Sequence, residues 1–239
     1  MTDLWQMGPI LIRLSMLYLI LSIAAGFLVM KTILKRKSPQ NMPFIDVLST
    51  SMLLALLIWK LSPMLTNPSL IMDPFSLLLY PGTPLGIQLA LAGALLYAIY
   101  GAWKRKIDWK AAMDTIVMGL IASSIVFLST HWQYGLPTSM PWGISISNPD
   151  LRYHPTNVYK LLLLIPAAWR LNQIEFGQGK AGYSGLQGLG VIWLLISLFD
   201  PKLTFIFGLT KEQVLAVSGI FVGGMVMMII RYTKSSERT

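Results

Sequence analysis

Seven apolar runs, separated by shorter polar stretches, set the pattern of this chain. They cover residues 10–30, 44–61, 85–103, 113–132, 158–171, 183–199 and 213–230. A helix needs about 20 mostly apolar residues to cross a bilayer. The run at 158–171 is shorter and contains Pro166, so neighbouring helices must cover the backbone groups that the proline leaves free. The pattern predicts an all-α integral membrane protein with seven transmembrane helices in a single domain, residues 1–239.

Composition supports the membrane assignment and excludes other classes. Of 239 residues, 54% are hydrophobic and 12% are charged, whereas soluble domains contain about 25% charged residues. The net charge of +9 does not indicate nucleic acid, because the basic residues flank the apolar runs. The absence of cysteine excludes disulfides and thiolate metal sites, and we expect no metal and no cofactor. The start of the chain has no basic leader, so we expect the first run to be a spanning helix rather than a removed signal.

Lysine and arginine residues predict the orientation. With seven helices, thirteen basic residues fall on one side, beside residues 31–37, 104–110, 170–180 and 231–238, and six fall on the other. Basic residues concentrate in cytoplasmic loops. We therefore expect the N-terminus outside, the C-terminus in the cytoplasm, and the loop 133–157 facing outward.

The longest polar interval, residues 141–160, holds His154, one of only two histidines. Pro155 directly precedes the fifth apolar run, and proline suits the first position of a helix, where a preceding polar residue can cap free N–H groups. This interval therefore predicts an ordered loop that leads into a helix.

The same interval carries a resemblance to a known family. Residues 141–143 read Pro-Trp-Gly, and residues 154–160 read His-Pro-Thr-Asn-Val-Tyr-Lys. They resemble the loop of bacterial prolipoprotein diacylglyceryl transferases, where a Pro-Trp-Gly segment precedes His-Pro-Thr/Ser-Gln-Leu-Tyr-Glu. The stretch FGLTKEQVLAVSGIFVGG is similar to that family's last helix and its preceding Gly-Leu-Thr-x-x-Gln. The resemblance implies seven helices, the N-out orientation and a bacterial plasma membrane.

The chain departs from the family where the chemistry lies. The family signature Gly-Arg-x-Gly-Asn-Phe-x-Asn-x-Glu corresponds to residues 123–135 here, which lack its arginine, asparagines and acid. Moving a diacylglyceryl group from phosphatidylglycerol to a cysteine needs a cation for the phosphate and a base for the thiol proton. We place no ionisable residue in the middle of a predicted span. These departures predict that the transfer chemistry is lost.

Several residues are candidates for a lipid site. Arg152 can bind phosphate through its planar guanidinium, and Lys160 can extend to a phosphate where the family has an acid. The resemblance adds Tyr159, which matches the motif, and Gly86, which falls in the family's glycine-rich loop. His154 and His131 are the candidate bases, although a histidine that braces the loop is the more common case.

Glycines in two predicted helices indicate close helix packing. Gly219 and Gly223 form a GxxxG pair in the last run, and Gly182, Gly185 and Gly188 occur in the sixth. Small residues let membrane helices approach closely, so we assign these positions to packing rather than to ligand binding.

The resulting hypothesis is a divergent relative of the transferases that binds an anionic phospholipid, phosphatidylglycerol by resemblance, and has lost transfer. It would bind the lipid or assist another membrane protein, and lipoprotein precursors are a further expected partner. The first alternative is an active phosphatidylglycerol–prolipoprotein diacylglyceryl transferase in lipoprotein biosynthesis that uses relocated residues at the outer rim. The second is a small transporter, against which the lack of buried charge argues.

Overall fold

The computed structural model describes residues 4–7, 10–146, 148–201 and 208–236, and it divides into two compact units. Unit 1 comprises Met1–Lys37 and Lys110–Thr239, and unit 2 comprises Ser38–Trp109. The prediction of one transmembrane domain over residues 1–239 stays a prediction.

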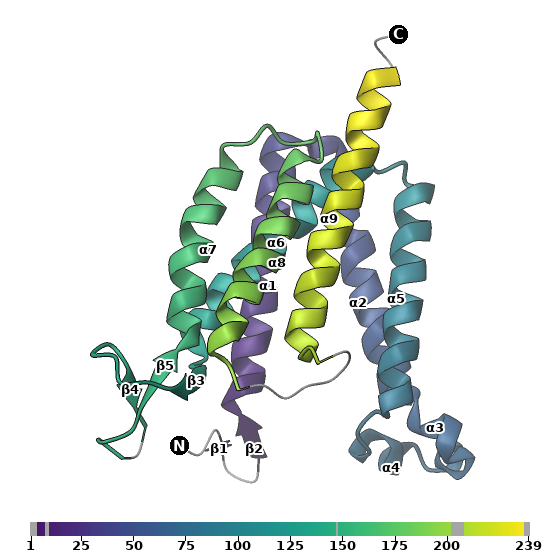
Figure 1. The fold of residues 1–239 in the computed structure, drawn as a ribbon. Coiled ribbons are helices and arrows are strands. Elements are labelled where there is room, and N and C mark those ends of the chain that lie inside the picture. Colours follow the sequence, from purple (N-terminus) through teal and green to yellow (C-terminus); the bar gives the residue numbers. More distant parts are fainter. Residues whose placement is uncertain (1–3, 8–9, 147, 202–207, 237–239) are drawn as a thin grey trace. The chain divides into compact units, whose positions relative to one another are not determined.

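Unit 1 is a bundle of long helices with a small sheet at one end (Figure 1). Its elements are β1 (Leu4–Met7), β2 (Ile10–Arg13), α1 (Leu14–Lys37), α6 (Trp109–Thr130), β3 (Tyr134–Pro137), β4 (Ile144–Ser145), β5 (Arg152–Pro155), α7 (Thr156–Asn172), α8 (Lys180–Ile196), the 3-10 helix η3 (Ser197–Phe199) and α9 (Lys211–Ser236).

Unit 2 is a helical hairpin with short helices at its turn. Its elements are η1 (Pro39–Asn41), α2 (Pro43–Leu61), α3 (Pro63–Thr66), η2 (Pro68–Met72), α4 (Pro74–Leu79) and α5 (Pro84–Lys104). Each begins with proline, whose missing N–H costs nothing at a helix start. Asp73 caps α4, and its hydrogen bonds from the hydroxyl and amide of Ser76 lower the pKa of the carboxyl.

Some helices begin or end at other residues than the apolar runs predicted. The first predicted helix, 10–30, is wrong at both ends. Residues Ile10–Arg13 pair with Leu4–Met7 as an antiparallel hairpin, and α1 begins at Leu14 and continues to Lys37. The fourth helix, predicted over 113–132, begins at Trp109 and ends at Thr130. Apolar runs locate membrane helices well, but β-branched residues such as Ile10 and Ile12 also suit strands.

The predicted outer loop, 133–157, which overlaps the interval 141–160 expected to be an ordered loop, contains a small antiparallel sheet. The strand order is β3-β5-β4, with Tyr134 opposite Pro155 and Ile144 opposite Tyr153. The expected cap is wrong in detail. α7 begins at Thr156, Pro155 is the N-cap residue rather than the first helical residue, and no side chain caps the helix. The Thr156 amide instead donates to the carbonyl of Gln133 at 3.1 Å.

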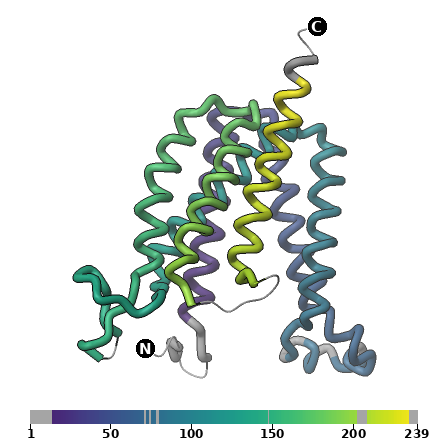
Figure 2. Tube along the Cα trace, viewed as in Figure 1, coloured from purple at the N-terminus to yellow at the C-terminus, as the bar shows by residue number. Residues whose placement is uncertain are grey.

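The core of unit 1 lies between α6, α7 and α8. It is formed by apolar side chains that are 0–7% exposed: Val117, Ile121, Leu128, Leu164, Leu171 and Ile192. α8 and α9 run side by side (Figure 2). Glycines make this approach close, because a Cβ at Gly190 would meet the Ala216 carbonyl oxygen at 2.6 Å.

A buried carboxylate joins α6 to the start of α8. Asp114 is 0% exposed, and its Oδ2 accepts hydrogen bonds from the amides of Gly177 at 2.8 Å and Gly179 at 3.1 Å. Its Oδ1 accepts from the Gly182 amide at 2.6 Å. Gly177 and Gly179 have φ of 90° and 72°, a conformation that glycine adopts without strain. Successive amides turned inward form an anion-binding concavity, which here holds a side chain of the protein itself.

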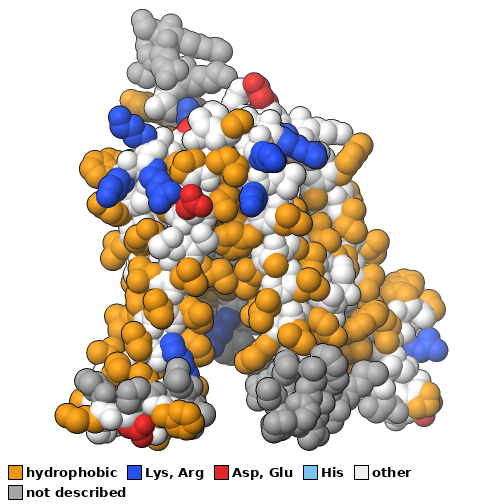
Figure 3. Space-filling view, turned by 180° about the vertical axis from the view of Figure 1, so that it is seen from behind, with side chains coloured by type: hydrophobic (Ala, Val, Ile, Leu, Met, Phe, Trp, Pro, Cys, Tyr) orange, Lys and Arg blue, Asp and Glu red, His pale blue; other side chains and the backbone are white. Residues whose placement is uncertain are grey.

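Six of the described helices are long and apolar enough to cross a membrane. They are Leu14–Lys37, Pro39–Thr66, Pro84–Lys104, Trp109–Thr130, Lys180–Phe199 and Lys211–Thr233. α7, which corresponds to the fifth predicted run, has 17 residues and is shorter than these. Figure 3 shows hydrophobic side chains over much of the face that it draws.

The two ends of unit 1 differ in charge. At one end the last turn of α1 carries Lys35, Arg36 and Lys37, and the Lys37 ammonium donates to the Asn172 side chain at the end of α7 at 3.5 Å. Arg170 is in that last turn of α7, and the start of α8, with Lys180, is tied to α6 by Asp114. The opposite end holds the small sheet and the start of α7. This division defines a basic end and a sheet end.

Candidate functional site

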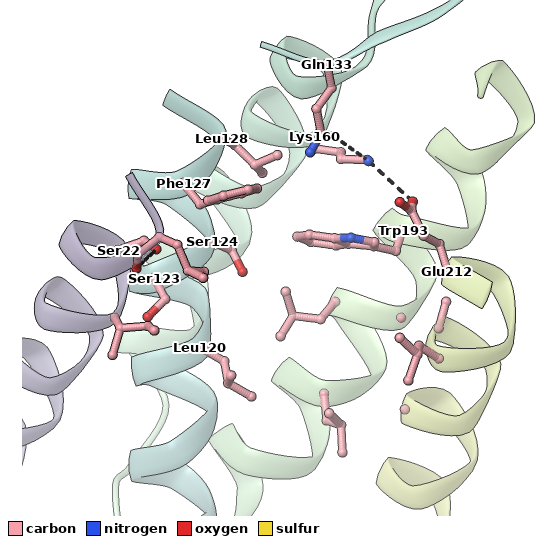
Figure 4. A pocket seen from close by; sticks show the side chains of 18 residues that line it. Ser22, Leu120, Ser123, Ser124, Phe127, Leu128, Gln133, Lys160, Trp193 and Glu212 are labelled. Atoms are coloured by element: carbon pink, nitrogen blue, oxygen red, sulfur yellow. Dashed lines mark hydrogen bonds and ion pairs between the residues drawn. The ribbon is translucent and has the colours of Figure 1, made fainter. Parts of the chain in front are cut away.

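A cavity of about 700 Å³ lies within unit 1 between α1, α6, α8 and α9, and Lys160 of α7 reaches it (Figure 4). Its walls are mainly aliphatic and aromatic, and the charged side chains that line it belong to the sheet end. The described lining residues are Leu19, Ser22, Ile23, Leu120, Ser123, Ser124, Phe127, Leu128, Gln133, Lys160, Leu186, Leu189, Gly190, Trp193, Glu212, Leu215, Ala216 and Gly219.

Lys160 is the buried cation of this cavity. It follows the first turn of α7 and is 2% exposed. Its Nζ donates to Gln133 Oε1 at 2.9 Å and lies 3.7 Å from Asp200 Oδ2 and 3.8 Å from Glu212 Oε2. The ammonium is also 5.8 Å from the centre of the Trp193 ring. A buried ammonium needs such partners because its transfer out of water costs several kcal/mol. Attraction to the partner groups offsets a cost of this order.

A capping box places Glu212 at the cavity. The Thr210 hydroxyl accepts from the Gln213 amide at 3.2 Å, and the Gln213 side chain accepts from the Thr210 amide at 3.0 Å. This reciprocal pair marks the start of a helix. Gln213 also donates to the Ser197 hydroxyl at 3.0 Å, which joins α9 to the end of α8. The motif Gly-Leu-Thr-Lys-Glu-Gln therefore orients the first turn of α9, and Glu212 within that turn faces Lys160.

Hydrogen bonds between the end of α6 and the start of α7 place Gln133 and Lys160. The Thr156 amide donates to the Gln133 carbonyl, and the Asn157 side chain donates to the Leu128 carbonyl at 3.1 Å. Thr156 and Asn157 are 0% and 3% exposed. This part of the His-Pro-Thr-Asn motif fixes the helix start so that Lys160 lies over the cavity.

The arrangement is suited to an amphiphilic ligand. An ammonium can form a charge-assisted hydrogen bond with a phosphate, and a carboxylate can accept a proton or pair with a cation. The apolar walls can cover hydrocarbon chains. Among the residues that the structure describes, no group of three His, Asp or Glu side chains is placed to hold a metal ion.

The candidates chosen from sequence fall in different places. Lys160 lines the cavity, whereas Arg152 does not appear among its described lining residues; it is exposed on β5 and donates to the Pro141 carbonyl at 3.4 Å. Gly86 belongs to unit 2, where its amide donates a hydrogen bond to the hydroxyl of Thr83. A Cβ at Gly86 would collide with the Ser62 hydroxyl. Glycine at this position is explained by the close approach of α5 to Ser62.

Tyr159 and His154 brace the small sheet. The Tyr159 hydroxyl lies 3.0 Å from His154 Nδ1 and accepts a hydrogen bond from the Trp142 indole at 3.0 Å. Both rings also pack against Phe199. His131, which follows α6, packs on the Phe127 ring at 5.1 Å. These contacts give each candidate a structural role, and a role in binding or catalysis stays a prediction.

The expectation that no charged side chain is buried is wrong. Lys160 is 2% exposed and Asp114 is 0% exposed, although both lie within two turns of a helix end. Sequence reasoning treated them as end charges because hydropathy does not reveal which helix face is covered. This removes the ground on which the transporter alternative was disfavoured.

Sequence reasoning also missed Glu212, Asp200 and Gln133. They come from three separate stretches, so no spacing along the chain connects them to Lys160. One local signal was available: Thr210 and Gln213 have the capping-box spacing, which predicts that Glu212 lies in a first helical turn.

The fold and the cavity define a class: helical membrane proteins with an internal pocket that is apolar along its walls and charged at one end. A profile of the prolipoprotein diacylglyceryl transferase family matches residues 2–230, and the chain belongs to that family. It is a multi-pass protein of the bacterial plasma membrane.

A curated relative from Streptomyces griseus, a phosphatidylglycerol–prolipoprotein diacylglyceryl transferase, is 30% identical over 109 residues. The match covers 39% of this chain and 34% of the relative, so the aligned part spans about a third of that protein's length. The relative's name specifies its lipid and protein substrates.

Proposed function

We propose that this protein binds a membrane phospholipid in the cavity of unit 1, with the phosphate at Lys160 and the acyl chains along the apolar walls. The observation that carries the proposal is a cation, 2% exposed, at the charged end of a cavity of about 700 Å³ whose walls are mainly apolar. Two acyl chains and one phosphate have this distribution of polarity. Phosphatidylglycerol, which the name of the Streptomyces relative specifies, is the first lipid to test.

The orientation that accompanies this proposal is N-out and C-in. It requires α7 to cross the membrane in addition to the six long helices, which makes seven crossings. The clustering of Lys35, Arg36, Lys37 and Arg170 at one end of unit 1 supports a cytoplasmic position for the basic end. The cavity's charged end then lies at the outer surface, together with the small sheet. Charged lining residues at one end only favour a lipid over a transported ion, which needs polar groups along a path.

The lipid site can be tested by native mass spectrometry of the purified protein with phosphatidylglycerol. We expect Lys160→Met to weaken lipid retention by roughly 1–3 kcal/mol, the range for a lost charge-assisted contact. Lys160→Arg should retain lipid, since it keeps the charge. Lys35→Ala, an exposed change at the basic end, is the matched control.

Arg152→Ala separates the cavity from the exposed strand. The sequence predicts that Arg152 also contacts the headgroup, which requires weaker retention in this variant as well. Lipid retention by folded Lys160→Met equal to that of wild type, with a cooperative melting transition as the folding criterion, would contradict the cavity site.

We further propose that diacylglyceryl transfer is lost. Ser123 and Ser124 line the cavity within the stretch that resembles the family signature, and neither supplies a charge. Purified protein given phosphatidylglycerol and a lipobox peptide should then leave the peptide cysteine unmodified.

One observation favours an active transferase as the second candidate, namely the carboxylate of Glu212 beside Lys160. Glu212 would take the proton of the cysteine thiol, and the sulfur would attack the glyceryl carbon. The bond between that carbon and the phosphate oxygen would break, and the leaving glycerol phosphate would depart beside Lys160. Thiol modification that is lost in Glu212→Gln would establish this candidate in place of the first.

A further inference from the structure

Among the residues that the structure describes, the ion-paired cluster at the cavity contains two acids and one base. The ion pairs join one ammonium, Lys160, to two carboxylates, Asp200 and Glu212, at 3.7 and 3.8 Å. Both distances exceed a hydrogen bond, whereas Gln133 accepts from Lys160 at 2.9 Å. The cation is therefore already balanced before a ligand enters, and one carboxylate is in excess among these three groups.

The two carboxylates differ in accessibility. The Asp200 side chain is 22% exposed and does not appear among the described lining residues of the cavity. The Glu212 side chain is 56% exposed and lines the cavity, where Figure 4 shows it directed toward Lys160. Asp200 can thus remain the counter-charge of Lys160 while Glu212 turns to a ligand.

A headgroup with a phosphate alone fits this cluster poorly. Its negative charge would approach Lys160 but also Glu212, and like charges at such short range repel. A headgroup that carries a phosphate and an ammonium places an opposite charge beside each side chain.

We propose that the cavity selects a zwitterionic, amine-bearing phospholipid, with its phosphate on Lys160 and its ammonium on Glu212. The inference rests on the proposed phospholipid site and specifies the headgroup class. Phosphatidylethanolamine has this chemistry, whereas phosphatidylglycerol has a neutral, hydroxylated headgroup beyond its phosphate.

The test is a competition between the two lipids for the full-length protein. Purified protein is mixed with equal amounts of phosphatidylethanolamine and phosphatidylglycerol with identical acyl chains, and native mass spectrometry measures the ratio retained. We expect wild type to prefer phosphatidylethanolamine. Glu212→Gln should reduce the preference by roughly tenfold, the effect of one lost charge-assisted contact.

A control variant and the pattern of lipid retention distinguish failure of the headgroup inference from failure of the proposed lipid site. Glu175→Gln removes an exposed acid in the loop between α7 and α8 and should leave the ratio unchanged. Failure of wild type to retain either lipid would overturn the proposed phospholipid site. Retention with a preference for phosphatidylglycerol, or a ratio that Glu212→Gln does not change, would overturn only the headgroup inference. Glu212→Asp, which keeps the charge, should preserve part of the preference if Glu212→Gln proves unstable.

Discussion

At the scale of single residues, Asp114 holds the α7–α8 loop to α6. Three backbone amides converge on one carboxylate that is 0% exposed. Hydrogen bonds to a charged acceptor are stronger than neutral ones, and a buried amide that loses its acceptor costs free energy. The contact replaces the capping side chain that α8 lacks at Gly179.

We therefore predict that Asp114→Asn lowers the free energy of unfolding by roughly 2–3 kcal/mol. Asparagine presents an NH₂ group to amides that need an acceptor, so at least one hydrogen bond is lost. Unfolding in increasing SDS, followed by circular dichroism, measures the change. Asp46→Asn is the matched control, because the Asp46 side chain is 72% exposed and its ion pair with Arg105 at 3.4 Å is a surface pair of small effect. Equal losses in both variants would refute the structural role of Asp114.

A local motif in the sequence drew attention to two residues at the sheet end, and their role in lipid binding stays a prediction. The His-Pro-Thr motif identified Lys160 and Tyr159, and both have defined contacts at the sheet end. The partners of Lys160 were missed because they come from the end of α6, the end of η3 and the start of α9. Only tertiary structure brings such distant positions together.

At the scale of elements, glycine decides how closely α8 and α9 pack. Gly223 was expected to lie at a close contact between helices. It does, since a Cβ there would meet the Tyr183 carbonyl oxygen at 3.0 Å. Gly219 is only in ordinary contact, at 3.7 Å from Leu186, and Gly188 has nothing within 4 Å. The closest approach, at Gly190, was not anticipated, because spacing alone does not show which face meets a partner.

Gly190→Ala and Gly188→Ala add the same methyl group to one helix and should differ in effect. At Gly190 the methyl meets the Ala216 carbonyl and Ile220 at 2.6 Å, so the helices must separate, with an expected loss of roughly 1–3 kcal/mol. At Gly188 the methyl is accommodated, and alanine favours the helix by about 0.5–1 kcal/mol. Thermal melting in detergent measures both variants. A loss of stability at Gly188 as large as at Gly190 would contradict the packing described.

At the scale of the whole molecule, hydropathy predicted the helical membrane class and located most helices. It missed the β1–β2 hairpin and the three-stranded sheet, since short strands give weak signals beside long apolar runs. It also did not divide the chain at Lys37 and Lys110, because the two units share one composition and one pattern.

The orientation makes a prediction for the intact protein. A reporter active only in the cytoplasm should work when fused after Thr239 and fail when inserted near Asn148, in the connection between β4 and β5. The reason is the basic end of unit 1, which the positive-inside rule assigns to the cytoplasm. Activity only at Asn148 would invert the protein and place the charged end of the cavity inside. Activity at both sites would require an even number of crossings between them.

The contact at Asp114 also has a consequence for biosynthesis. Its three amide donors lie 63, 65 and 68 residues later in the chain, so α6 and α7 are translated before those donors exist. A carboxylate near the start of α6 resists entry into lipid until it has hydrogen-bond donors. Until the protein amides are made, water at the membrane surface must supply these hydrogen bonds. We therefore expect α6 to stay at a shallow depth until the start of α8 leaves the ribosome. Arrival of the glycines around 177–182 would then let α6 settle before α9 adds the last wall of the cavity.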